Sequence, residues 1–171
     1  MADQGGEVNW YEANPRAIIE IEGFHVPHDL KRILNRRCFE VHFDRSFEQV
    51  MRYCSQRNPT WISEEIIHSY VALHREGYAH SVETWQNGEL VGGLYGVAIG
   101  GAFFGESMFH RVPHASKVAL VHLARHLQKR GFVLHDAQVM TSTLKLFGAE
   151  NISRAEYSKR LKAALKKKVV F

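Results

Sequence analysis

The chain has 171 residues, of which 45% are hydrophobic and 23% charged, so it can bury a core and is not a disordered polar tail. A net charge of +4 favours an acidic partner, with nucleic acid as the first candidate. The two cysteines, Cys38 and Cys54, form neither a disulfide framework nor a metal-binding pair. No apolar run is long enough to cross a membrane and the N-terminus has no apolar signal region, so we expect a cytoplasmic protein.

A recognisable hydrophobic periodicity begins only after residue 36, so residues 1–36 are expected to be irregular. From there, apolar alternation predicts strands and capped apolar stripes predict helices. In chain order, the expected elements are a strand at 38–44, a helix capped by Ser46, a helix from Ser63 to Gly77, strands at 80–85, 89–99 and 102–108, a helix at 116–130, a strand at 132–140, a short helix at 142–147 and a helix from Ser153 to about 168.

This order of strands and helices resembles the N-acetyltransferase (GNAT) superfamily. The resemblance implies an α+β fold, with a mixed sheet flanked by helices over residues 37–171 and acyl transfer to an amine as the reaction. Members of that superfamily hold the pyrophosphate of coenzyme A in a glycine-rich loop, because glycine lets backbone N–H groups approach the phosphates. Here the segment 106–117 contains no glycine, and Pro113 removes a further donor. We therefore expect a different acyl donor and no cofactor.

Six short blocks carry a second resemblance. They are Thr60-Trp61-Ile62, residues 79–85, residues 90–96, Gly105-Glu106-Ser107-Met108-Phe109, Ala115-Ser116-Lys117 and Asp136-Ala137-Gln138. In this order, and over nearly the whole chain from about Trp10, they resemble the leucyl/phenylalanyl-tRNA–protein transferase family. One block alone is moderately specific, whereas six in the family's order argue strongly against a chance match.

The resemblance implies transfer of Leu or Phe, with Met as a further candidate, from aminoacyl-tRNA to proteins that begin with Arg or Lys. Such proteins are thereby marked for degradation, and the enzyme is expected to act as a monomer. Two alternatives remain open. One is a coenzyme A-dependent N-acetyltransferase, and the other is a non-catalytic protein that binds tRNA or protein N-termini.

Three polar residues are the candidate catalytic set. Asp136 and Gln138 lie two positions apart on one strand, so both side chains leave by the same face. By resemblance, Gln138 contacts the attacking amine and Asp136 polarises or orients Gln138, while the carboxylate of Glu106 meets the positively charged acceptor. The alternative is that all three make ordinary structural hydrogen bonds and ion pairs.

The other candidates form the donor site. Leu94, Phe103, Met108 and Leu120 match positions of the family's apolar pocket, where a soft methionine-containing surface can accept both Leu and Phe. His135 stands where the family usually has an aliphatic residue. Trp61 and Tyr70 match aromatic residues near the terminal adenosine, on which a base can stack.

Each of these residues has a simpler interpretation. The pocket residues can belong to the core, as can Tyr70 on its apolar helix face, and the basic last helix can be a solvated surface. Arg16 matches a family block and has no assigned role. Eleven histidines, among them His122 and His126, form no recognisable metal motif, so no metal site is expected.

The start of the chain carries one more expectation. The family has a small N-terminal domain, and its last block in some members reads on into Met-Ala-Asp, as this sequence does from Met1. We therefore expect residues 1–36 to be a remnant of that domain, which in the family helps to close the cleft over the donor.

Overall fold

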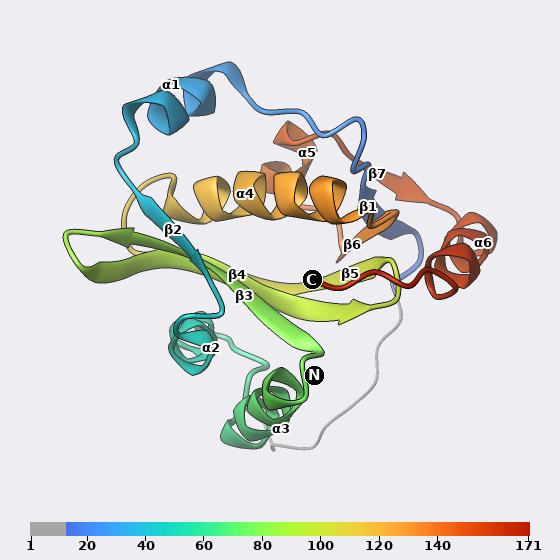
Figure 1. The fold of residues 1–171 in the computed structure, drawn as a ribbon, viewed down its shortest axis with the longest axis horizontal. Helices are drawn as coiled ribbons and strands as arrows, with labels where there is room; N and C mark the ends of the chain where they lie inside the picture. Colours follow the sequence, from blue (N-terminus) through green and yellow to red (C-terminus); the bar gives the residue numbers. More distant parts are fainter. Residues whose placement is uncertain (1–12) are drawn as a thin grey trace.

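The computed structural model describes residues 13–171, so expectations about Met1 lie outside the described residues. Within that range, seven strands form one mixed sheet with six helices around it (Figure 1). The strands are β1 (Arg16–Ile19), β2 (Glu40–Phe43), β3 (Ala79–Gln86), β4 (Glu89–Ile99), β5 (Ala102–His110), β6 (Leu134–Gln138) and β7 (Ala149–Ile152). The helices are α1 (His28–Arg36), α2 (Phe47–Ser55), α3 (Glu64–Arg75), α4 (Ala115–Arg130), α5 (Ser142–Leu146) and α6 (Arg154–Ala164).

The sheet has the strand order β2-β3-β4-β5-β6-β1-β7. In the part of the chain that the structure describes, β5 and β6 are the one parallel pair. Their pairing is short, because only residues 102–104 lie opposite residues 134–136. β5 then continues to His110 without pairing to β6. The carboxyl ends of two adjacent parallel strands therefore separate, which is a common place for a binding site.

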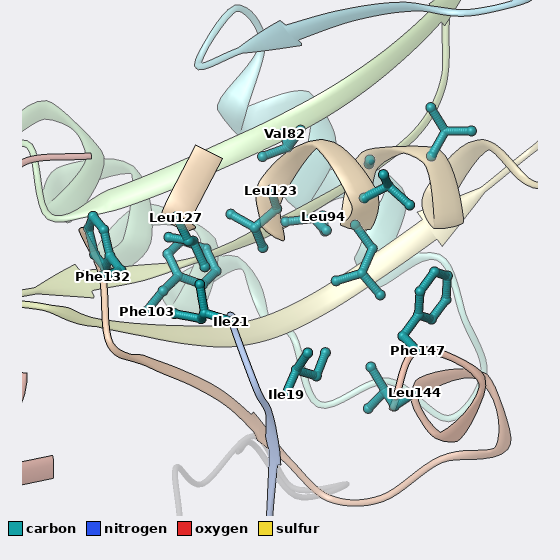
Figure 2. Packing of buried hydrophobic residues seen from close by; sticks show 14 of the residues in the cluster. Ile19, Ile21, Val82, Leu94, Phe103, Leu123, Leu127, Phe132, Leu144 and Phe147 are labelled. Carbon is teal, nitrogen blue, oxygen red and sulfur yellow. The ribbon is translucent and has the colours of Figure 1, made fainter. Parts of the chain in front are cut away.

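Helices cover both faces of the sheet. α4 lies across one face, while α2 and α3 lie on the other (Figure 1). α4 buries an apolar stripe against the sheet, and Figure 2 shows Leu123 and Leu127 of this helix beside Val82, Leu94 and Phe103. On the opposite face, α2 and α3 contribute Phe47, Val50, Met51 and Ile67 to a second cluster with Tyr95 and Phe109. No helix in residues 13–171 has the length and apolar character needed to cross a bilayer.

Gly92 lets the first turn of α4 approach β4. A Cβ atom at Gly92 would lie 2.5 Å from the Cβ atom of Ala115 and 2.9 Å from its carbonyl carbon. Such distances are far shorter than a carbon–carbon van der Waals contact. The missing side chain therefore allows residues 115–117 to lie close to the sheet, at the edge of the cleft described below.

The expected α+β class with a mixed sheet flanked by helices is confirmed, and the predicted elements after residue 36 occur in the predicted order. The expectation that residues 1–36 are irregular is wrong from residue 16 onward, because β1 and α1 lie there. β7 is a further strand that the sequence does not predict. β1 and β7 have four residues each, too few to show alternation. In addition, β1 lies between two strands and buries Ala17, Ile18 and Ile19 in succession.

Of the three serines at which a helix is expected to begin, Ser63 and Ser153 cap their helices. Ser63 Oγ accepts a hydrogen bond from the backbone N–H of Ile66, and Ser153 Oγ accepts one from Glu156. Ser46 precedes α2 but makes no side-chain cap. Instead, its backbone N–H donates to Glu83 Oε1 at 2.6 Å, and Glu83 is fully buried. A carboxylate from β3 therefore holds the chain at the start of α2.

Candidate active site

A cleft of about 1090 Å³ opens where β5 and β6 stop pairing, bounded by α2, α3 and the first turns of α4. Eight of the ten residues that the sequence nominates line this cleft. They are Trp61, Tyr70, Leu94, Glu106, Met108, Leu120, His135 and Gln138. The structure thus brings together residues from five elements and one loop, whereas Asp136 and Phe103 lie outside the lining.

Asp136 is fully buried behind the cleft, and both of its carboxylate oxygens are occupied. Oδ1 accepts from Arg16 Nε at 2.9 Å and from the backbone N–H of Gln138 at 2.8 Å. Oδ2 accepts from Arg16 Nη2 at 2.8 Å and from the Tyr157 hydroxyl at 2.5 Å. Burial and the Asp136 carboxylate raise the pKa of Tyr157, so this hydroxyl remains a donor.

Gln138 ends β6 and turns its side chain toward β5. Its backbone has φ 62°, in the left-handed region that few residues other than glycine adopt. Its Nε2 atom donates to the carbonyl oxygen of Gly105 at 2.9 Å and to Glu106 Oε2 at 3.1 Å. An amide nitrogen has two protons, so both are used here. The amide oxygen of Gln138 is left as a hydrogen-bond acceptor in the wall of the cleft.

Glu106 is partly buried at the position where β5 leaves β6. Burial raises the pKa of its carboxyl group, and the nearby charge of Asp136 adds to this effect. Hydrogen bonds from Gln138 and Tyr70 oppose the rise, as does the charge of Arg16. Glu106 is therefore a carboxyl group with increased proton affinity that faces the cleft.

The apolar wall of the cleft is formed by β4, β5 and α4. Leu94, Met108 and Leu120 line it, together with Leu123 and Leu144. Among the nominated pocket residues Phe103 is the exception, because its ring is fully buried and packs behind the cleft wall. It lies edge-on to His135, with ring centroids 5.8 Å apart, and stacks on Phe171 at 5.5 Å. The physical reason is that inward-facing residues of a sheet covered by a helix join the core unless the sheet opens there.

His135 lies on β6 with its side chain almost completely buried. Its Nδ1 atom has no hydrogen-bond partner in the part of the chain that the structure describes. Burial lowers the pKa of His135 to about 4, so the ring is neutral at pH 7. The residue at position 135, where the family usually has an aliphatic side chain, is thus a neutral ring with one unsatisfied nitrogen in an otherwise apolar wall.

Comparison with known proteins gives a consistent result. A sequence model of the family described as leucyl/phenylalanyl-tRNA protein transferase matches residues 18–162. The transferase of that name from Rubrobacter xylanophilus is 52% identical over 97% of this chain and 87% of its own length. That of Gloeobacter violaceus is also 52% identical, over 95% of this chain and 84% of its own length. The chain belongs to the leucyl/phenylalanyl-tRNA–protein transferase family.

Among solved structures, a PaiA N-acetyltransferase from Thermoplasma acidophilum in complex with coenzyme A is also similar. It has a TM-score of 0.41 and 12% sequence identity, and the similarity covers 72% of this chain and 88% of that one.

Several cleft residues of this family member are not nominated by sequence reasoning. Four cations, Arg16, Arg57, Arg111 and Lys117, line the cleft, and within the described residues Glu106 is the one carboxylate in the lining. Arg57 donates to Ser107 Oγ at 2.7 Å, and Arg111 donates to the Tyr53 hydroxyl at 3.3 Å. Lys117 lies within a block that carries the resemblance, which is a usable signal. Arg57 and Arg111 are ordinary among 22 basic residues, so the sequence offers no signal for them.

The histidines do not gather into a metal site. No group of three or more potential metal ligands occurs in residues 13–171. Burial lowers the pKa of both His122 and His126 on α4, with a smaller contribution from nearby arginines.

Proposed function

We propose that this protein transfers Leu or Phe, with Met as a further candidate, from aminoacyl-tRNA to the α-amino group of proteins that begin with Arg or Lys. The product is thereby marked for degradation. The observation that carries the proposal is the family match over residues 18–162, together with relatives that share about half of their residues with this chain and are named for this transfer.

The proposed reaction is aminolysis of an ester. The nitrogen of the acceptor amine attacks the carbonyl carbon of the donor, the new C–N bond forms, and the C–O bond to the ribose breaks. One amine proton ends on the released ribose hydroxyl. An α-amino group has a pKa of about 7.7–8, so a fair fraction is neutral near pH 7 and needs only modest help from a base.

Gln138 and Glu106 are suited to the acceptor side. The amide oxygen of Gln138 has no donor from Gly105 or Glu106, because those groups accept from its nitrogen. It can therefore accept a hydrogen bond from the attacking amine and orient the nitrogen lone pair. Glu106 has increased proton affinity and supplies the negative charge that attracts a positively charged acceptor. It is our candidate for taking the amine proton.

The opposite wall is suited to the donor. Leu94, Met108 and Leu120 offer an apolar surface for the side chain of the transferred residue. Trp61 and Tyr70 line the same cleft, and an exposed aromatic face can stack on the terminal adenine. Tyr70 is also tied to the core, since its ring lies edge-on to Tyr95 with centroids 5.5 Å apart.

The cations around the cleft support RNA as the source of the donor. Arg57, Arg111 and Lys117 can neutralise phosphates near the 3′ end of a tRNA. Because phosphate binding releases counterions, binding should weaken steeply between low and physiological salt. We further propose that the protein acts as a monomer in the cytoplasm, where charged tRNA is made.

A transfer assay tests the proposal. Radiolabelled Leu-tRNA is incubated with the protein and a peptide that begins with Arg, with an otherwise identical peptide that begins with Ala as the matched acceptor. A parallel reaction contains labelled acetyl-CoA. We expect label to move from tRNA to the Arg peptide and much less to the Ala peptide.

The other outcomes decide between the alternatives. Label that moves only from acetyl-CoA would establish an N-acetyltransferase and refute the proposal. Binding of charged tRNA without any transfer would indicate a non-catalytic binding protein.

A further inference from the structure

Asp136 lies behind the cleft and contacts the backbone of Gln138, which lines the cleft. It does not line the cleft, and its oxygens are occupied by Arg16, by Tyr157 and by the backbone N–H of Gln138. No oxygen is free to take a proton from an acceptor. Apart from its charge, which acts on Glu106, and its pairing with Arg16, Asp136 acts on the cleft through its hydrogen bond to the backbone N–H of Gln138.

The backbone of Gln138 needs such support. A residue with a Cβ atom at φ 62° is strained, and that strain persists only where the surroundings hold it. The hydrogen bond from its N–H to Asp136 Oδ1 at 2.8 Å is the contact that does so. The left-handed turn directs the side chain across to Gly105 and Glu106, and Gln138 lines the cleft with an amide oxygen that neither contact uses.

Arg16 and Tyr157 in turn hold Asp136. Arg16, on β1, donates to it from two nitrogens, and Tyr157, on α6, donates from its hydroxyl. The guanidinium carbon of Arg16 also lies 5.2 Å from the centre of the Tyr157 ring. This packing limits the movement of both donors.

We infer that Arg16 and Tyr157 are positioning residues for transfer, which fix the carboxylate of Asp136, hence the backbone of Gln138 and hence the amide oxygen that meets the acceptor amine. The inference rests on the proposed function. It concerns two residues from opposite ends of the chain, neither of which touches the acceptor in this scheme.

Tyr157 offers the cleanest test, because Tyr157→Phe removes one hydroxyl and keeps the ring. Arg16→Lys is the second variant, since it keeps the charge and loses the paired geometry. Arg160→Gln is the matched control. Arg160 is on the same helix and pairs with Glu156 and Glu20, with no contact to Asp136. It reports what loosening α6 does without removing a donor from Asp136.

The decisive measurement is a double-mutant cycle with Gln138→Ala. With saturating donor and acceptor, we expect Tyr157→Phe to lower kcat about tenfold and to change KM for the peptide less than about twofold. In the Gln138→Ala background the same change should lower the residual rate less than about twofold, because the amide it positions is gone. Arg16→Lys should behave in the same way, and Arg160→Gln should retain at least half of the wild-type rate.

Three results would overturn the inference. One is an equal loss from Tyr157→Phe with and without Gln138, and another is no loss at all. The third is an Arg160→Gln variant as slow as Tyr157→Phe, which would mean that α6 docking alone is responsible.

A second readout does not depend on activity. The side-chain amide signal of Gln138 in a nitrogen–proton correlation spectrum can be assigned from its loss in Gln138→Ala. It should shift in Tyr157→Phe and stay in place in Arg160→Gln. If the wild-type protein transfers nothing, the proposed function fails while this spectrum still decides whether Tyr157 positions Gln138.

Discussion

Asp136 and Glu106 are two carboxylates on neighbouring strands of one sheet, and their surroundings differ sharply. Asp136 is fully buried and accepts hydrogen bonds from a guanidinium, a hydroxyl and a backbone amide. Glu106 lines the cleft and has neutral partners, Gln138 and Tyr70. Within the candidate site, the first carboxyl group is fixed by its hydrogen bonds, while the second faces the cleft and has a raised pKa.

This difference separates two roles that residue type alone does not distinguish. A carboxylate with every lone pair occupied holds other groups in place, whereas one with few donors is available to a substrate. Replacement of Asp136 should therefore mainly reduce stability, whereas replacement of Glu106 should mainly reduce the rate of transfer.

The largest effect is expected on stability at Asp136. Asp136→Ala leaves the largely buried guanidinium of Arg16 and the hydroxyl of Tyr157 without their partner, and should lower the free energy of unfolding by about 4 kcal/mol. Urea unfolding at neutral pH measures this. Glu106→Gln, measured alongside, should cost far less, and equal losses at the two positions would break the comparison.

His135, next to Asp136 on β6, extends the comparison to a buried group without a partner. Its pKa is lowered from 6.5 to about 4, so its neutral form stabilises the folded state above pH 6.5, and this contribution is lost as the pH falls through about 4. The shift corresponds to about 3 kcal/mol at most. His135→Leu should therefore flatten the decrease in stability between pH 6.5 and 4, as measured by unfolding at several pH values. An unchanged acid profile would contradict the assignment.

A smaller effect is expected on the rate at Glu106. Glu106→Gln removes the group that we propose takes the proton, and should lower kcat/KM for an Arg-peptide about a hundredfold. Affinity for charged tRNA, measured by filter binding, should stay within about twofold. Loss of tRNA binding together with the rate would assign Glu106 to the donor side instead.

The smallest expected effect is on the pH dependence of stability at Glu106, which should have the opposite sign to that at His135. Because the pKa of Glu106 is raised above its ordinary value of 4.5, it stabilises the folded state fully below that pH, and the contribution is lost as the pH rises through the raised value. Glu106→Gln should thus gain stability relative to the wild type as the pH rises from 4 to 8. A constant difference across this range would mean that burial does not affect Glu106 as described.

The sequence predicts most of the fold because most elements carry a local signal. α4 shows an apolar stripe over four turns, and Asn87-Gly88 marks a hairpin whose two residues both have positive φ. α3 is also predictable, because Ser63 is a residue type that commonly caps helices and it does so here. β1 lacks such a signal, since Arg16–Ile19 becomes a strand only when β6 and β7 pair with it on both sides.

The site is predictable only in part for a related reason. The family resemblance assigns Glu106 and Gln138 to one site, and the structure shows the hydrogen bond between their side chains. The role of Arg16 could not be predicted, because its partner lies 120 positions further along the chain. The expectation that Asp136 and Gln138 project from one face fails to describe how they interact, since the left-handed backbone of Gln138 brings its N–H, not its amide side chain, to Asp136.

The position of β1 also bears on when the site can exist during folding. The strand is synthesised well before β6 and β7, its two neighbours in the sheet. Contacts between such distant segments close a long loop and form late. A nascent chain that has completed β3, β4 and β5 can already position Glu106. Asp136 follows later, on β6, and it lacks its partner Arg16 until β1 joins the sheet. We therefore expect the proposed acceptor site to be among the last features to form.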